Sequence, residues 1–352
     1  MKKLLALILA LGFLAIGSGA VYGFIFVTTA AGDSSDTILF DVPPGSSFSK
    51  VSYQLHKEGI IRDARLFSLY ARLTGSATSL HVGEYKLSPD MTPREVLDVL
   101  AEGKSVIHLV TFPEGYNLYE MTQTLNAKWE GRGDEFLEAA RNKSYVKEIL
   151  KMDAISFEGY LFPDTYSLTK YTSAKEIIKM MVNRFNKTYD EIVAEESKLK
   201  MDRHDHVTFA SVVEKETGAP EERPMISSVF HNRLRKKMRL QSDPTIIYGH
   251  WVKTGEYLKN IRRKHIKAPT AHNTYSVKAL PIGPVSNPGK ESLRAALNPV
   301  ESDYLYFVSR NDGTHVFSKT LKQHNAAVRE WQLNSKNRQG KSWRDLKKRK
   351  KK

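Results

Sequence analysis

The stretch VTFASVVEKET, residues 207–217, decides the fold that we predict for the larger part of this chain of 352 residues. An apolar run is followed by two acids, which indicates a helix that is buried along most of its length. Positions three, four and seven residues apart share one face of a helix, so Glu216 lies on the same face as Val213, Val212 and Phe209. We therefore predict that Glu216 faces apolar surroundings at the end of this helix.

Glu216 is the candidate catalytic residue. A carboxyl in apolar surroundings is disfavoured as an anion, so its pKa rises and it can hold a proton near neutral pH. A general acid for a glycosidic oxygen needs that property. Glu214 lies on a smaller and more mixed surface of the same helix. The alternative is that Glu216 lies in solvent at the helix end, or pairs with Lys215 or Arg233.

A polar cluster downstream is a candidate binding segment. Gln241, Ser242 and Asp243 stand just before Pro244, which begins a further helix. Such a cluster of donors and acceptors can hold hydroxyl and acetamido groups. The Pro- and Gly-rich stretch at residues 280–289 predicts irregular loops, and loops of this kind often line binding clefts.

The block FEGYLFPDTY, residues 157–166, is a second candidate binding segment. Rings that carry hydroxyls suit the faces and edges of sugars, and carboxylates such as that of Glu158 bond sugar hydroxyls. The alternative is a packed turn whose aromatic residues belong to the core. The sequence leaves both interpretations open.

Around these segments the pattern predicts an α+β fold. Strands are expected at residues 37–42 and 83–87 on either side of two short helices, and this order resembles the LysM-like module of cell-wall proteins. The same order recurs in unrelated small domains, so a spacer fold is the alternative. Further elements are predicted as follows: helices from Thr92, from Leu118, at Ala174 to about Lys200, Ser227–Leu234, from Pro244, Ser292–Leu297 and from His324 through Trp331, and strands His108–Phe112, Tyr304–Ser309 and His315–Phe317.

The N-terminal segment predicts a membrane anchor. Residues 4–27 carry no charge over 24 positions, and a helix needs about 20 apolar residues to cross a bilayer. Lys2 and Lys3 place the N-terminus in the cytoplasm by the positive-inside bias, so the chain from Asp33 onward faces outward. A single span in the inner (cytoplasmic) membrane is expected. The alternative is a removed signal peptide cleaved near residues 29–31.

Composition excludes several classes of function. The formal net charge is +15, but residues 341–352 hold eight Lys or Arg and one Asp, so +7 of it lies in the last twelve residues. The rest of the chain is only mildly basic and has no zinc spacing or aromatic nucleic-acid motif, so no nucleic acid is expected as a partner. The chain has no Cys, which excludes disulfides, thiolate zinc sites and a cysteine nucleophile. The basic tail is expected to be solvated, or to touch anionic lipid or envelope polymer.

Taken together, the motifs resemble the YceG-like family of endolytic murein transglycosylases, MltG. The resemblance rests on the block at residues 158–166, on ASVVEKET at 210–217, on residues 230–248, on Asn273-Thr274-Tyr275 and on residues 304–325. It covers most of residues 155–331. The chain departs from the family pattern in His272 and in the Lys-rich tail. By similarity the catalytic glutamate of the family falls on Glu216.

The resemblance implies a chemistry with one glutamate. Glu216 protonates the oxygen between N-acetylmuramic acid and N-acetylglucosamine, then removes the proton of the muramic C6 hydroxyl as that oxygen closes on C1. A 1,6-anhydro end forms without water, and no metal or other cofactor is needed. The family also implies that Gln241, Asn273 and Tyr275 position the sugar, with Asp243 and Glu158 as further candidates.

The resemblance also implies an organisation and partners. Glycan strands of peptidoglycan are the substrate, and penicillin-binding proteins are expected neighbours where nascent strands end. The predicted domains are as follows: a cytoplasmic N-terminus and anchor at 1–32, a LysM-like module with its connecting strand and helix at 36–125, a junction at 126–154, a YceG-like catalytic domain with a lysozyme-like glutamate-bearing helix at 155–335, and a basic tail at 336–352.

Two other functions compete with this hypothesis. A muramidase would hydrolyse the same bond with a positioned water and leave reducing ends. A non-catalytic cell-wall binding or scaffold protein would use the LysM-like module alone. The ends of the products distinguish the first alternative, and the absence of any cutting would indicate the second.

Overall fold

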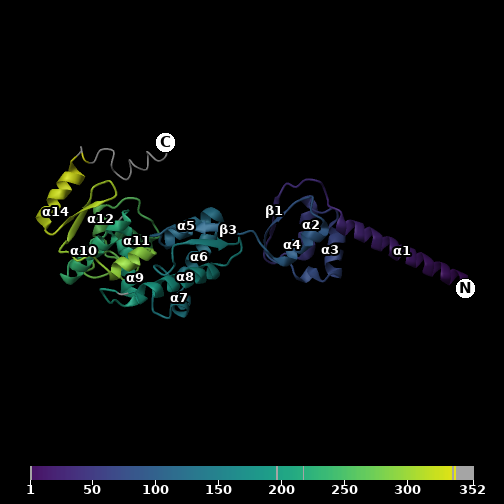
Figure 1. Cartoon of the computed structure of the whole chain (residues 1–352), viewed down its shortest axis with the longest axis horizontal. Coiled ribbons are helices and arrows are strands. Elements are labelled where there is room, and N and C mark those ends of the chain that lie inside the picture. Colours follow the sequence, from purple (N-terminus) through teal and green to yellow (C-terminus); the bar gives the residue numbers. More distant parts are fainter. Residues whose placement is uncertain (1, 196, 217, 335–336, 338–352) are drawn as a thin grey trace. The chain divides into compact units, whose positions relative to one another are not determined.

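The computed structural model describes residues 2–195, 197–216, 218–334 and 337 (Figure 1). The chain divides into two compact units. The first contains residues 1–110 and 166–172, and the second contains residues 111–165 and 173–352. Helices dominate both units, and the strands within the described ranges form three two-stranded sheets. This confirms the mixed α+β class that the sequence predicts.

An apolar helix begins the first unit. α1, Lys2–Thr28, exposes most of its large side chains, and residues 3–28 are long and apolar enough to cross a membrane. Its last turn differs, because Phe26 is only 9% exposed and joins the core of this unit. α1 packs there against α3, Ala64–Leu73, and α4, Pro93–Glu102. The apolar helix therefore continues without a break into folded protein.

The first unit is built on one antiparallel strand pair. β1, Ile38–Val42, pairs with β2, Gly83–Leu87, so that Ile38 faces Leu87 across the pair. Phe40 and Tyr85 are opposite each other and fully buried, as expected where one sheet face packs on helices. α2, Phe48–Lys57, and α3 lie between the two strands in sequence. The predicted strand–helix–helix–strand order is confirmed, while its relation to LysM modules stays a prediction.

Side-chain caps fix the helices of this unit. Ser47 accepts a hydrogen bond from the backbone of α2, Asp63 does the same for α3, and Thr92 forms a capping box with Glu95 in α4. A 3-10 turn, η1, Ser76–Thr78, follows α3.

The chain returns once to the first unit. β3, His108–Thr111, is hydrogen-bonded to β4, Thr165–Leu168. Asp41 accepts hydrogen bonds from Lys170 Nζ at 2.8 Å and from Tyr171 Oη at 2.9 Å, which hold the returning segment. β4 is not among the predicted strands, because its partner strand is more than fifty residues away and its four residues carry little pattern of their own.

The second unit is mostly helical, and its core surrounds α9, Arg203–Glu216. α9 packs against α10, α11 and α13 (Figure 1). The other helices and turns of this unit are α5 Leu118–Lys128, α6 Arg132–Arg141, α7 Lys143–Leu150, α8 Ala174–Ala194, η2 Pro220–Glu222, α10 Arg223–Arg235, α11 Asp243–Thr254, α12 Arg263–Ile266, α13 Lys290–Leu297, α14 Leu321–Val328 and the π-type turn η3 Arg329–Leu333. β5, Tyr306–Ser309, pairs antiparallel with β6, His315–Ser318.

Residues 126–154, expected as a junction, form α6 and α7 within the second unit. Phe136 and Val146 are fully buried there, so these helices contribute to the core despite their polar sequences. The predicted helix from His324 begins at Leu321, and Trp331 lies in the π-type turn that follows it. The basic tail at residues 341–352 lies outside the described residues. The functional domain limits drawn from the sequence stay predictions.

Candidate active site

The helix that carries the candidate acid begins at a carboxylate cap. Asp202 Oδ1 accepts hydrogen bonds from the backbone N–H groups of His204 at 2.8 Å and Asp205 at 3.1 Å. From residue 206 to residue 214 every side chain of α9 is buried. Glu216 is the last residue of α9 and is partly exposed to solvent. The helix is thus surrounded by protein along most of its length and ends at a partly buried glutamate.

Burial raises the pKa of the Glu216 carboxyl from 4.5 to about 7. This value also includes the negative charge of Asp243, which raises the pKa, and the Ser242 hydroxyl and the positive charge of Arg233, which lower it. At neutral pH both the protonated and the ionised forms are therefore well populated. A group in this state can donate a proton in one step and accept one in the next.

The partners proposed in the alternative interpretation of Glu216 are engaged elsewhere. Lys215 Nζ donates to the Gly115 carbonyl at 3.0 Å and lies 3.6 Å from a carboxylate oxygen of Glu120. Arg233 donates to backbone carbonyls instead. Among the described residues no cation lies within ion-pair distance of the Glu216 carboxyl.

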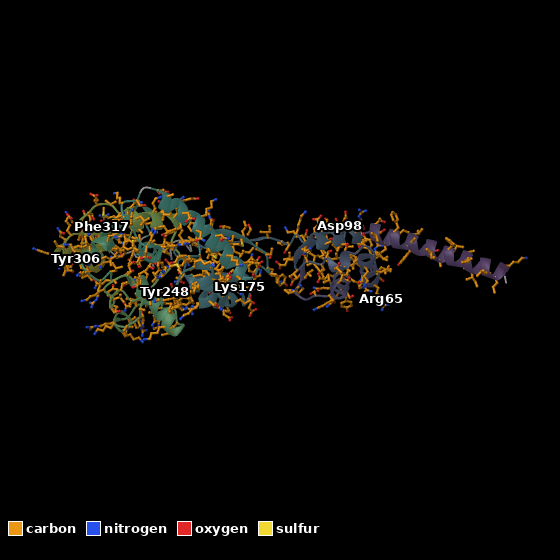
Figure 2. The ribbon with its side chains drawn as sticks, turned by 90° about the horizontal axis from the view of Figure 1, so that it is seen from below. Arg65, Asp98, Lys175, Tyr248, Tyr306 and Phe317 are labelled. Atoms are coloured by element: carbon orange, nitrogen blue, oxygen red, sulfur yellow. The ribbon has the colours of Figure 1, made fainter. Side chains whose placement is uncertain are left out.

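Arg233 fixes the segment that faces Glu216. Its Nη1 donates to the Leu240 carbonyl at 2.7 Å and its Nε to the Leu305 carbonyl at 2.7 Å. The guanidinium also lies over the ring of Tyr306, a residue labelled in Figure 2. Arg233 is thus a structural cation whose charge reaches Glu216. Sequence reasoning did not identify this role, because the two carbonyls belong to segments far apart in the chain.

Asp243 and Tyr275 form the other polar pair beside Glu216. Tyr275 Oη donates to Asp243 Oδ1 at 2.7 Å. Burial, this hydrogen bond and the charges of Asp243 and Glu216 raise the pKa of Tyr275, so its hydroxyl stays protonated. Asp243 is exposed, and Asp243 and Pro244 are the first two residues of α11. The structure therefore brings together Glu216, Asp243 and Tyr275 from three separate segments.

Gln241 and Ser242 lie on a tightly held turn at the same place. Gln241 has a left-handed backbone with φ of 52°, and its side chain is exposed. The backbone N–H of Ser242 donates to Thr274 Oγ1 at 2.9 Å, and Thr245 Oγ1 is 2.9 Å from the same hydroxyl. Ser242 Oγ is buried without a hydrogen bond of normal geometry among the described residues, and it lies near enough to Glu216 to affect its pKa.

Asn273 shapes the loop that presents Tyr275. Its amide nitrogen donates to the carbonyls of Ala268 at 2.7 Å and Ile266 at 3.0 Å, and its amide oxygen accepts from the Tyr275 backbone at 3.0 Å. The side chain is 1% exposed, so these backbone groups occupy its hydrogen-bonding capacity. Direct sugar contact by Asn273 stays a prediction, and the contacts assign it a positioning role.

Glu158 has a different set of neighbours from Glu216. Its carboxyl is buried and accepts from the Leu118 backbone N–H at 2.9 Å and from Asn287 Nδ2 at 2.8 Å. Burial raises its pKa to about 8. Asn287 Oδ1 also accepts from the backbone of Gly159 at 2.9 Å, so the amide ties the aromatic block to the loop before α13. The prediction that Glu158 binds sugar stays untested, and both its oxygens already have protein donors.

Glu214, the neighbouring acid on α9, is fully engaged. Its Oε1 pairs with Arg223 Nη2 at 2.9 Å, and its Oε2 accepts from the Gly289 backbone at 3.1 Å. A buried pair with complementary hydrogen bonds holds its geometry. Of the two acids at the end of α9, only Glu216 therefore lacks an ion-pair partner among the described residues. In the same ranges no group of three or more His, Asp or Glu is arranged to hold a metal ion.

The fold and this site define a class of protein: an α+β chain with an apolar N-terminal helix and, at the end of a buried helix, a glutamate whose pKa is raised to about 7. The chain belongs to the YceG-like family, whose family model matches residues 40–330. The match covers parts of both compact units.

Several known proteins are similar to this chain. The endolytic murein transglycosylase of Bacillus subtilis strain 168 is 31% identical over 339 residues, which cover 92% of each chain. The endolytic murein transglycosylase of Streptococcus pneumoniae D39 is 27% identical over 357 residues, 92% of this chain and 64% of that protein. The crystal structure of a YceG-like protein from Listeria monocytogenes has a TM-score of 0.55 and 35% identity, and it covers 84% of this chain and all of its own.

Proposed function

We propose that this chain is an endolytic murein transglycosylase, a lyase that cleaves the bond between N-acetylmuramic acid and N-acetylglucosamine in peptidoglycan. Two relatives that match 92% of the chain carry that name. The observation that carries the proposal is the Glu216 carboxyl, whose pKa of about 7 suits a group that must act as both acid and base.

The reaction balances with one carboxyl. Protonated Glu216 gives its proton to the glycosidic oxygen, and the bond from that oxygen to C1 of the muramic residue breaks. The oxygen of the substrate's own N-acetyl group stabilises the positive carbon. The C6 hydroxyl then bonds to C1 and gives its proton to the Glu216 carboxylate, so the acid is regenerated and a 1,6-anhydro end remains.

The groups around Glu216 suit a sugar ring. The exposed Gln241 amide can bond hydroxyl or acetamido groups, and the Asp243 carboxylate can accept from hydroxyls while Tyr275 holds it in place. Asn273 acts through the loop that presents Tyr275. These roles are proposals from contacts and family resemblance together.

We propose that α1 anchors the chain in the cytoplasmic membrane, with the N-terminus inside and the chain from Asp33 onward outside. The length and apolar character of α1 support a single span, and Lys2 and Lys3 support this orientation. An anchored enzyme would act on nascent strands near the membrane, where penicillin-binding proteins are the proposed neighbours. The LysM-like assignment of the first unit and the lysozyme-like assignment of α9 belong to the same proposal.

The products test this function directly. Peptidoglycan sacculi are digested with the full chain in detergent, and the new ends are read by mass spectrometry. We expect 1,6-anhydro ends from the wild type and a rate about 10²–10⁴-fold lower from Glu216→Gln, which lacks the acid. Glu221→Gln, which makes the same change at an exposed carboxyl, serves as the matched control and is expected to cut normally.

Two outcomes would replace the proposal. Reducing ends in place of anhydro ends would identify a muramidase, the alternative that the names of the relatives do not favour. Binding to sacculi without any cutting by the wild type would identify a scaffold protein.

A further inference from the structure

The second unit contains a cavity whose lining shares two segments with the group around Glu216, α11 and the loop of residues 272–275. Its volume is about 260 Å³, and most of its wall is apolar. Its polar lining includes Arg141, Lys143, Ser156, Tyr248 and His272. Tyr248, labelled in Figure 2, belongs to α11, the helix that also carries Asp243. Ligand pockets of whole small molecules are commonly about 300–1,000 Å³, so this cavity suits a small part of a larger ligand.

His272 is a buried polar side chain without a partner. It is 7% exposed and packs edge-on against the Tyr248 ring, with ring centroids 4.9 Å apart. Neither ring nitrogen has a hydrogen bond to any residue in the described ranges. Burial lowers its pKa to about 4, so the imidazole is neutral and offers one donor and one acceptor. His272 lines the cavity, so a polar group bound there can form a hydrogen bond with the imidazole.

Two cations without carboxylate partners line the same cavity. Arg141, at the end of α6, and Lys143, at the start of α7, are exposed, and within the described parts of the chain neither forms an ion pair. The Arg141 guanidinium lies 4.4 Å from the centre of the Trp251 ring, which holds the group in place. Lys147, one turn further along α7, differs because it pairs with Asp153 at 2.8 Å.

Glu158, the acidic residue in the cavity lining, does not repel an anion bound there. Its pKa of about 8 keeps the carboxyl protonated at neutral pH. Its two oxygens face the Leu118 backbone and Asn287. The cavity therefore has a positive edge and a neutral interior, and a guanidinium with a free edge binds carboxylates well.

Two segments lead from the Glu216 group to this cavity. Asp243 and Tyr248 are five residues apart on α11, a rise of roughly 7.5 Å. His272 precedes Tyr275 by three residues on one loop. The Glu216 group and the cavity therefore share two segments of the chain, α11 and the loop of residues 272–275.

We propose that the cavity is a subsite for the stem peptide that muramic acid carries, with Arg141 and Lys143 binding a peptide carboxylate and His272 bonding the adjacent amide. This inference rests on the proposed function and adds a determinant of substrate choice. The enzyme would then prefer glycan strands that still carry peptides to strands without them.

Paired substrates test the subsite. Full-length protein in detergent is given peptide-bearing glycan strands, or the same strands after an amidase has removed the peptides. We expect the wild type to have a kcat/KM about 10–100-fold higher on peptide-bearing strands, the range that charged hydrogen bonds supply. Arg141→Gln combined with Lys143→Gln should lose this preference and keep the activity on bare strands. Lys147→Gln, the paired lysine nearby, is the matched control and should keep the preference.

The outcomes separate the subsite from the function. If the wild type cuts neither substrate, the proposed function fails. If it cuts both equally well, or if the double variant keeps the preference, the subsite is overturned and the function stands.

Direct binding distinguishes the source of the carboxylate. The probes are N-acetylmuramoyl-L-alanyl-D-glutamate, its diamide and free N-acetyl-D-glutamate, each measured by calorimetry. We expect the muramoyl dipeptide to bind at least about tenfold more tightly than the diamide, and His272→Gln and His272→Phe to weaken it. If free N-acetyl-D-glutamate binds as tightly as the muramoyl dipeptide, the cavity takes a free small carboxylate and the stem-peptide assignment is wrong.

Discussion

Replacing Glu216 by Gln is expected to stabilise the folded protein at high pH while it removes the proposed acid. The pKa of this carboxyl is 4.5 when it is free and about 7 in the folded chain. The folded state therefore holds its proton more tightly than the unfolded state, and the free energy of unfolding falls as the pH rises from 4.5 to about 7. The amide in Glu216→Gln does not ionise, so the variant escapes this loss.

The expected size of this stabilisation follows from the pKa of Glu216 in the unfolded and in the folded chain. At about 1.4 kcal/mol per pH unit, the interval from 4.5 to about 7 corresponds to at most about 3.5 kcal/mol. The Glu216 side chain is partly exposed, and solvent screening reduces the effect of its charge. We therefore expect the free energy of unfolding of Glu216→Gln to be larger than that of the wild type by about 1–2 kcal/mol at pH 8. Below pH 4.5 the two proteins should be equally stable, because both side chains are then neutral.

Urea unfolding of the full chain in detergent measures this difference. All four Trp residues follow residue 111, so Trp fluorescence reports on the unit that holds Glu216. Glu221→Gln, at an exposed carboxyl, is the control, and its free energy of unfolding should equal that of the wild type at pH 5 and at pH 8. A stability gap for Glu216→Gln that is the same at pH 5 and pH 8, or a variant less stable than wild type at pH 8, would refute the reasoning.

Three further predictions concern single residues. Asp243→Asn removes a negative charge that raises the pKa of Glu216, so the alkaline limit of cleavage should shift to lower pH; a pH–rate profile that does not move would contradict this coupling. Asn273→Ala should destabilise the second unit by about 1–3 kcal/mol, because it leaves buried carbonyls without their donor; unchanged urea unfolding would show that water replaces the amide. Phe26→Ala should destabilise the first unit by about 1–3 kcal/mol, whereas Leu14→Ala, on the exposed part of α1, should not destabilise it. Hydrogen exchange of the backbone amides in the first unit measures both effects. Equal effects of the two variants would contradict the packing of the last turn of α1 against this unit.

The elements with strong local patterns were predictable from the sequence. α9 has an unbroken buried run, which its apolar sequence predicts. The helices α6 and α7 were missed because their few core residues, such as Phe136 and Val146, stand among charged ones. β4 was missed because a strand of four residues depends on a distant partner.

The site was predictable only where one segment supplies the chemistry. Spacing places Asp243 at the start of a helix, but its hydrogen bond to Tyr275 joins residues 32 positions apart. The contact of Arg233 with the Leu305 carbonyl spans 72 positions. The sequence marks His272 only as a departure from the family pattern, since its burial against Tyr248 results from packing between α11 and a loop.

The proposed chemistry depends on Glu216 holding a proton near neutral pH. A carbon-13 NMR titration of the full chain in detergent, with labelled glutamate carboxyls and the Glu216 signal assigned by its loss in Glu216→Gln, measures this pKa directly. We predict a value of about 7. A value near 4.5, the ordinary one for a hydrated glutamate, would mean that the folded protein has no acid at this position and would contradict the proposed chemistry.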